Sequence, residues 1–145
     1  MYHPATWIRE SMAHGGAAGL GLKELPPIQG EEVLRDFLKR FVDDADRTWW
    51  WEGLKGLEKR MESPESAGIL PALVGVPEDS EAILITTPDD GEPITLFEGR
   101  FANLCRLIDD CPYFEFVIVS RQLDWALLES HHNEVLLARN SGLKG

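Results

Sequence analysis

The chain has 145 residues, a length typical of one domain, and we expect a single domain over residues 1–145 whose first segment, residues 1–30, is less firmly held. Its formal net charge of −11 argues against nucleic acid as a partner, because phosphate recognition requires a surface rich in Lys and Arg, and favours a basic protein instead. No apolar run approaches the roughly 18 residues of a membrane span and the N-terminus lacks a signal-peptide pattern, so we predict a cytoplasmic protein without membrane contact.

The first half of the chain predicts three helices. A short N-terminal helix is expected over residues 6–14, before a stretch rich in glycine. The strongest helical pattern covers residues 31–45, with Gly30 at the N-cap position. Its apolar stripe follows the 3.6-residue period and consists of Val33, Leu34, Phe37, Leu38, Phe41 and Val42. A third helix is expected over residues 49–61, where Thr48 can cap the first turn.

Three adjacent tryptophans, Trp49, Trp50 and Trp51, open the third predicted helix. Successive residues of a helix are turned by about 100°, so the three side chains cannot all face a core. They either clamp this helix to the rest of the domain or form an aromatic hot spot where a partner docks. A platform that stacks on a small ligand is a third alternative.

The second half of the chain predicts strands and one more helix. Residues 63–80 hold three prolines among apolar side chains, which indicates an ordered crossing rather than a free linker. A helix over residues 100–110 presents one apolar stripe. The predicted strands cover residues 82–87, 94–97, 114–120, 125–130 and 134–138. The first two form a hairpin and the last three form a meander, in which Asn133 suits the left-handed conformation of a tight turn.

These elements predict an α+β fold with an antiparallel sheet of about five strands. The strand over residues 114–120 is apolar on both faces, which is typical of a central strand. We expect the helices over residues 31–45, 49–61 and 100–110 to cover mainly one face of this sheet, with the short N-terminal helix beside them.

Residues with catalytic or metal-binding chemistry gather at the last predicted turn. Strand alternation places Trp125, Glu129 and His131 on one face, so that a carboxylate lies beside an imidazole, while His132 points to the other face. A Glu–His pair of this kind suits a general base. If the turn brings both imidazoles together, Glu115 on the neighbouring strand completes a set of metal ligands. A hairpin tip of this composition also fits turn geometry alone, or a binding surface.

Other signatures of catalysis and cofactor binding are absent. The chain has no GxSxG, no HExxH, no phosphate-binding loop with Lys and Ser or Thr, and no GxGxxG after a strand. Cys105 and Cys111 have neither a redox nor a zinc spacing, so we expect two buried free thiols. Cys105 also lies on the inward stripe of its helix, where a thiol is a poor nucleophile. The sequence therefore predicts no cofactor.

Distinctive motifs occur in several parts of the chain. They are the segment from Trp49 to Lys55, Phe97-Glu98-Gly99 before a helix, the strand from Phe114 to Ser120, and Asp124-Trp125 leading to Glu129-Ser130-His131-His132-Asn133. Together they resemble a family of small bacterial proteins known only as a domain of unknown function. The resemblance spans nearly the whole chain and implies one domain, but it implies no reaction and no ligand. Gly53 and Asn133 stand where that family commonly has acids.

We therefore predict a non-catalytic, acidic protein-binding domain of the cytoplasm, such as an immunity-type inhibitor of a basic toxin or enzyme. Between residues 78 and 92 the chain has six acids and no Lys or Arg, which forms either a solvated surface or a steering patch for a cationic protein. The predicted binding surface comprises Trp49, Trp50, Trp51, Trp125, Glu129, His131, His132 and Asn133. A metal- or small-molecule-binding protein or enzyme with its site at the Glu129/His131/His132 hairpin is one alternative, and a self-associating structural subunit is another.

Overall fold

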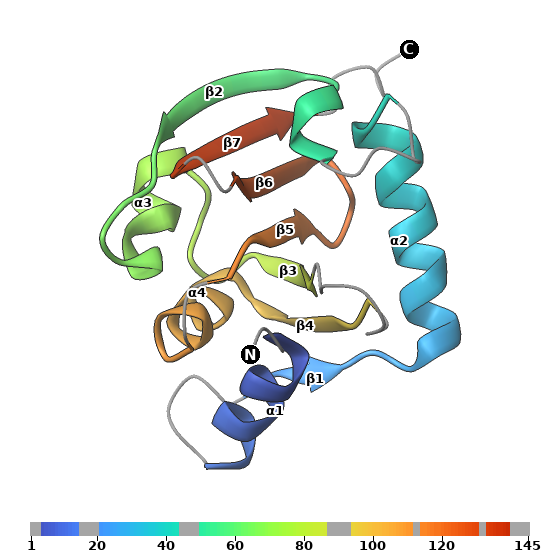
Figure 1. Cartoon of the computed structure of the whole chain (residues 1–145), viewed down its shortest axis with the longest axis vertical. Coiled ribbons are helices and arrows are strands. Elements are labelled where there is room, and N and C mark those ends of the chain that lie inside the picture. The colour runs from blue at the N-terminus through green and yellow to red at the C-terminus, as the bar shows by residue number, and fades with distance from the viewer. Residues whose placement is uncertain are drawn as a thin grey trace.

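A seven-stranded antiparallel sheet forms the centre of the protein, with the strand order β1-β4-β3-β5-β6-β7-β2 (Figure 1). The computed structural model describes residues 4–14, 21–43, 50–86, 94–111, 114–130 and 133–139. The strands are β1 (Lys23–Glu24), β2 (Leu57–Glu62), β3 (Glu81–Thr86), β4 (Leu96–Arg100), β5 (Phe116–Ser120), β6 (Trp125–Ser130) and β7 (Glu134–Arg139). The helices are α1 (Pro4–Ala13), α2 (Pro27–Phe41), α3 (Leu70–Val74) and α4 (Phe101–Asp109), with short 3₁₀ turns η2 (Trp50–Gly53) and η3 (Ala67–Ile69).

The predicted α+β class is confirmed, and a strand overlaps each of the five predicted ones. The expected number of strands was wrong, because two further strands, β1 and β2, extend the sheet at its edges. β1 has only two residues, too few to produce a recognisable pattern. β2 has the sequence LEKRME, whose charged residues do not alternate with apolar ones. The strand predicted to be central, β5, has three strands on either side of it, and the predicted meander β5-β6-β7 is present.

The helix predicted over residues 49–61 is wrong. The described part of this segment forms the turn η2 and then enters β2, which pairs with β7. Gly56 separates the two elements with a φ of +74°, a left-handed conformation that no helix continues through. The Arg139 N–H donates to the Gly56 carbonyl at 3.0 Å, so the backbone groups of this segment are satisfied by β7 rather than within a helix. Trp49 lies outside the described residues.

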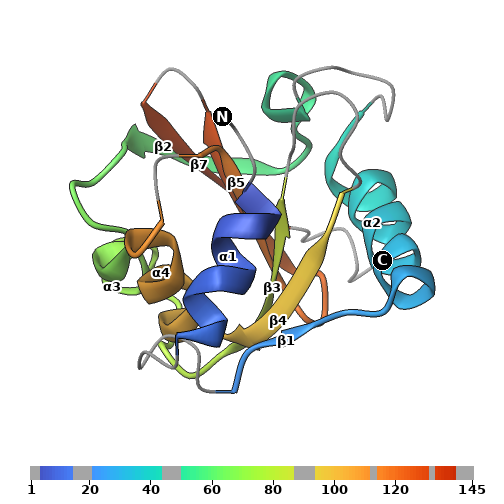
Figure 2. The ribbon, with the colours of Figure 1, turned by 60° about the horizontal axis from the view of Figure 1, so that its bottom comes forward.

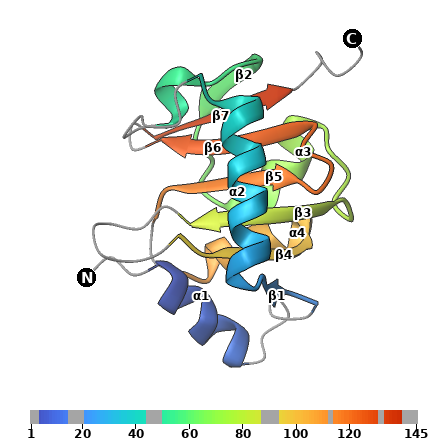
Figure 3. The same cartoon turned by 90° about the vertical axis from the view of Figure 1, so that its right-hand side faces the viewer.

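Helices cover both faces of the sheet, which corrects the expectation that they cover mainly one. Figure 2 shows α1, α3 and α4 on one side of the strands and α2 on the other. Figure 3 shows α2 running across the strands of its face. Strands buried on both sides require this arrangement, because alternate residues point to opposite faces. Ile118 of β5 therefore packs in the α4 core, and its neighbours Val117 and Val119 pack in the α2 core.

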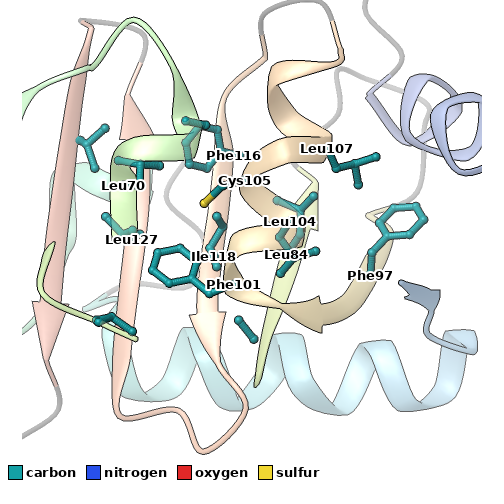
Figure 4. Packing of buried hydrophobic residues seen from close by; sticks show 14 of the residues in the cluster. Leu70, Leu84, Phe97, Phe101, Leu104, Cys105, Leu107, Phe116, Ile118 and Leu127 are labelled. Atoms are coloured by element: carbon teal, nitrogen blue, oxygen red, sulfur yellow. The ribbon is translucent and has the colours of Figure 1, made fainter. Parts of the chain in front are cut away.

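The core on the α4 side is the larger of the two. Figure 4 shows side chains of α4, including Leu104 and Leu107, above the side chains of the central strands, including Leu84 and Ile118. Phe101 begins α4 and is completely buried. The predicted helix over residues 100–110 is thus present with its apolar stripe turned inward, as expected.

The apolar stripe of α2 forms the second core. Phe37 and Phe41 are completely buried, and the other members of the predicted stripe pack around them. The helix begins at Pro27 rather than at residue 31, because proline is favoured in the first turn, where its missing N–H costs nothing. Gly30 is therefore inside the helix. It packs closely under β4, where an added Cβ would lie 3.7 Å from a methyl group of Leu96.

The crossing predicted over residues 63–80 is ordered, and the Asp109 carboxylate at the end of α4 holds it in place. One carboxylate oxygen accepts the Ala67 N–H at 2.7 Å, and the other accepts the Ser66 hydroxyl at 2.7 Å and the Gly68 N–H at 3.0 Å. These bonds satisfy N–H groups at the start of η3 that no helix carbonyl can reach. Leu70 of α3 then inserts completely into the core.

The turns were predicted more accurately than the edges. Leu123 and Asn133 have positive φ values of 61° and 60°, and Asn133 therefore adopts the left-handed conformation expected of it. The predicted turn at residues 88–91 lies outside the described residues.

At the N-terminus, α1 matches the predicted helix to within two residues. The Arg9 guanidinium donates to both carboxylate oxygens of Glu24, at 2.8 and 2.9 Å. That ion pair attaches α1 to β1.

Gly56 and Gly75 provide a matched pair of substitutions that tests the junction between η2 and β2. Both have a positive φ, so Ala costs about 1–2 kcal/mol at either position. A Cβ at Gly75 meets no atom within 4 Å, whereas a Cβ at Gly56 would lie 2.3 Å from the Arg139 carbonyl oxygen. In urea denaturation, Gly56→Ala should therefore lower the free energy of unfolding by about 1–3 kcal/mol more than Gly75→Ala does. Equal losses would show that β2 is not held against β7 as described.

Candidate functional site

The residues predicted to form one binding surface lie in three separate places. Trp125 begins β6 and Glu129 is near the other end of the same strand, both on the α4 face of the sheet. Trp50 packs under α2 on the opposite face. His131 and His132 lie outside the described residues, as does the side chain of Trp51. Of the predicted residues that the structure describes, it brings Glu129 and Asn133 together, both bound to Ser63.

Ser63 joins Glu129 to Asn133 at one end of the sheet. Its hydroxyl donates to Glu129 Oε2 at 2.6 Å, and its N–H donates to the Asn133 carbonyl at 2.9 Å. Glu129 is only 5% exposed. The expected sharing of one face is confirmed for Trp125 and Glu129, since Val135, the cross-strand partner of Glu129, lies in the same core as Trp125. Ser63 was missed because it is 66 residues away from Glu129 in sequence and only the β2–β7 pairing brings it close.

Burial raises the pKa of the Glu129 carboxyl above its ordinary value of 4.5. The hydrogen bond from Ser63 opposes this rise, and the negative charge of Glu115 adds to it. Glu115 was suggested as a distant metal ligand, and here its negative charge helps to raise the pKa of the Glu129 carboxyl. Among the described residues no three His, Cys, Asp or Glu side chains are grouped so as to hold a metal ion. A metal site that includes His131 and His132 stays a prediction.

Trp50 clamps the segment before β2 onto α2. Its ring meets the Phe37 ring edge-on, with the ring centroids 5.6 Å apart, and it remains half-buried. Of the alternatives for the tryptophans, a clamp is thus what Trp50 forms. Trp125, by contrast, is 5% exposed and packs against Phe101, with ring centroids 5.0 Å apart.

The two cysteines are free thiols. Burial raises the pKa of Cys105 to about 12, with a further contribution from the charge of Asp109. Burial also raises the pKa of Cys111 to about 11, with a contribution from Asp110. Both side chains are therefore protonated at neutral pH and are poor nucleophiles. The prediction of buried thiols is correct for Cys105, whereas Cys111 is half-buried.

Comparisons with protein-family models, curated proteins and solved structures give no match to the chain. In the parts of the chain that the structure describes, no helix has the length and apolar composition to cross a membrane. The candidates for contact with a partner or ligand are therefore those residues of the chain that remain accessible after both faces of the sheet have been covered.

The raised pKa of Glu129 makes stability depend on pH. Because the folded state binds this proton more tightly than the unfolded state, the free energy of unfolding falls as pH rises from about 4.5 through the higher native pKa. Glu129→Gln keeps an oxygen acceptor for Ser63 but carries no charge. We expect the free energy of unfolding of this variant to rise relative to that of the wild-type protein as pH increases across that range. Above the range, the difference between the two should stay constant.

Urea denaturation at a series of pH values between 4 and 8 measures this difference. Ser63→Ala serves as a second variant, because it removes the hydrogen bond that opposes the rise in the Glu129 pKa. In this variant the pH range over which stability falls should extend to higher pH. Parallel pH profiles for the wild-type protein and Glu129→Gln would contradict the burial of a titrating carboxyl at this position.

Proposed function

We propose that this chain is a non-catalytic domain that binds a basic polypeptide, as an immunity-type inhibitor does, and that its partner docks on the outer edge of β2. One observation carries the proposal. β2 is the last strand in the sheet order, and within the described residues no strand pairs with its outer edge. Five of its six residues are exposed. Such an edge presents N–H and C=O groups with which another extended chain can pair.

The backbone groups that an added strand would need point outward at defined positions of β2. The Ser63 N–H bonds to the Asn133 carbonyl in the same register as the β2–β7 ladder. Hydrogen-bonded and non-hydrogen-bonded positions alternate along an antiparallel pair of strands. The backbone of Met61 therefore bonds to β7, while Arg60 and Glu62 direct their N–H and C=O groups away from it. An extended segment can therefore bind by β-augmentation.

Apolar surface borders this edge. Leu57 of β2 is 44% exposed, and Ile69 and Leu73 are 48% and 39% exposed. The Lys59 ammonium donates to the Leu73 carbonyl at 3.2 Å, which places α3 beside β2. Half-buried Trp50 precedes the strand. A docked segment would thus combine backbone hydrogen bonds with apolar contacts, the usual composition of a protein interface.

Charge favours a basic partner over a neutral one. Of the six acids between residues 78 and 92, three are described and all are exposed, namely Glu78, Asp79 and Glu81. Asp89, Asp90 and Glu92 lie outside the described residues. On β2 itself the Arg60 guanidinium is engaged by the Glu134 carboxylate at 3.1 Å. The field of the net charge of −11 speeds the approach of a cationic polypeptide and is screened by salt.

The edge also carries features that limit pairing with unsuitable strands. Four of the six β2 residues are charged, and the register shifts by one position between Leu57 and Lys59. Charged residues and bulges on edge strands prevent indiscriminate aggregation. A partner of matching charge pattern is therefore favoured over a second copy of the chain.

Arg60→Pro tests the edge directly. It removes an outward N–H but leaves the bonds between β2 and β7, and proline is tolerated at such edge positions. Arg60→Ala is the matched control, because it also loses the ion pair with Glu134 but keeps the N–H. In affinity capture from the native lysate at low salt, the wild-type protein and Arg60→Ala should retain a basic protein that Arg60→Pro retains at least about tenfold less well.

High salt should release the captured protein, since the attraction is partly electrostatic. Circular dichroism must first show that both variants are folded. Capture of the same protein by Arg60→Pro at wild-type level would exclude the edge as the docking surface. If light scattering instead shows a dimer that Arg60→Pro dissociates, β2 is a self-association surface and the proposed function is wrong.

A further inference from the structure

A pocket of about 280 Å³ opens at the end of the sheet opposite Glu129. There the antiparallel strands β3 and β6 begin and β5 and β7 end, so their terminal residues Glu81, Trp125, Ser120 and Arg139 all border it. Asp124, from the turn before β6, also lines the pocket. Its volume is just below the roughly 300–1,000 Å³ of pockets that hold drug-sized molecules, which limits a ligand to a smaller size.

Hydrogen bonds hold the Asp124 carboxylate in a fixed position at this pocket. The Ser120 hydroxyl donates to Asp124 Oδ1 in a short hydrogen bond, and the Asp124 N–H donates back to Ser120 Oγ at 2.9 Å. The backbone N–H of Trp125 donates to the same hydroxyl oxygen at 3.3 Å. Ser120 is buried and Asp124 is exposed, so this network runs from the core to the surface at the pocket. Asp124 Oδ2 accepts no hydrogen bond from the described residues, and it is available to a ligand.

Two residues with nitrogen donors, Arg139 and Trp125, line the same pocket. Arg139 faces Trp125 in the β6–β7 ladder and uses its Nε to bind Glu58 at 2.9 Å. Its two terminal nitrogens bond to no residue that the structure describes, and Asp124 and Glu81 are not within ion-pair distance of them. Trp125 is 5% exposed, yet no hydrogen bond joins its indole N–H to an acceptor in the described part of the chain. Buried indole N–H groups usually have a partner.

We propose that this pocket binds a small zwitterion of the α-amino-acid class. The ligand's ammonium group binds Asp124 Oδ2 and the Glu81 carboxylate at the rim, and its carboxylate binds the terminal nitrogens of Arg139 and the indole N–H of Trp125. A simple cation would make no use of the Arg139 and Trp125 donors, and a simple anion would be repelled by the two acids. A ligand with both charges can bind the acids and the nitrogen donors at once, and charge-assisted hydrogen bonds are the stronger kind. Arg121 lies 4.0 Å from the Glu81 carboxylate, so Asp124 is the main contact of the ammonium group. The proposal does not depend on a protein partner.

Isothermal titration calorimetry with each of the twenty common L-amino acids tests the proposal. At least one should bind, and its N-acetyl form, which lacks the ammonium, and its amide form, which lacks the carboxylate, should each bind at least about tenfold more weakly. Binding of neither the amino acids nor their derivatives at millimolar concentration would overturn the proposal, as would equal binding of all three forms.

Variants of the full chain then assign the contacts. Asp124→Asn and Arg139→Gln should each weaken binding at least about tenfold, and Trp125→Phe, which keeps an aromatic ring but removes the N–H, about fivefold. Arg9→Gln is the matched control for Arg139→Gln. It breaks a comparable exposed Arg–Glu pair, at 2.8 Å, between α1 and β1, away from the pocket, and should bind as the wild-type protein does. Wild-type affinity in folded Asp124→Asn or Arg139→Gln would show that any binding occurs elsewhere.

Discussion

Burial of both faces of the central strands is the constraint on which this structure depends. All five residues of β5 and all six of β6 are buried. Because successive residues point to opposite faces, a sheet of such strands must be covered on both sides to remove its apolar surface from water. The stripe of α2 with Phe37 and Phe41 meets one side, and α4 with Phe101 meets the other. Each helix therefore serves a separate core, and neither alone could bury the sheet.

Within the residues that the structure describes, both faces of the central strands are covered, which leaves the edges and ends of the sheet accessible. At one edge, two-residue β1 is held by the ion pair between Arg9 and Glu24. At the other edge, β2 is longer, charged and mostly exposed. Charges and a bulge on an edge strand discourage aggregation. The proposed docking role of β2 follows from this asymmetry between the two edges.

The two ends of the sheet hold its buried polar groups. At one end the Glu129 carboxyl is buried with Ser63, and its negative form is disfavoured there. At the other end the Ser120 hydroxyl binds the Asp124 carboxylate and accepts the backbone N–H groups of Asp124 and Trp125. A buried polar group without full hydrogen bonding costs free energy, so its presence in an otherwise apolar sheet calls for a compensating contact. At the Trp125 end, a zwitterionic ligand would provide that contact.

Local sequence pattern was sufficient to predict the elements that depend on residues close together in the sequence. The apolar stripe of α2, the apolar runs of β5 and β6, and the left-handed turn at Asn133 were all predictable. Each of these depends on periodicity or on the conformational preference of a single residue. The α+β class followed from their order along the chain.

The segment from Trp50 to Met61 shows where local pattern failed. Its residues Trp50, Leu54, Leu57 and Met61 are spaced as on one face of a helix, which led to the wrong helix prediction. In the structure they separate: Trp50 packs in the α2 core, Met61 packs in the α4 core, and Leu57 is largely exposed. The available edge of β7, together with the left-handed Gly56, decides in favour of a strand.

The sequence by itself identified some of the residues of the candidate sites, but it did not determine which residues lie together. Trp125 and Glu129 were identified, yet their partners Arg139 and Ser63 were not, because these contacts join residues that only strand pairing brings together. No periodicity records which strand lies beside which, since register is set by the whole sheet and its two cores. Tertiary structure alone therefore decided that Trp125 borders a pocket with opposite charges and that Glu129 is buried with Ser63.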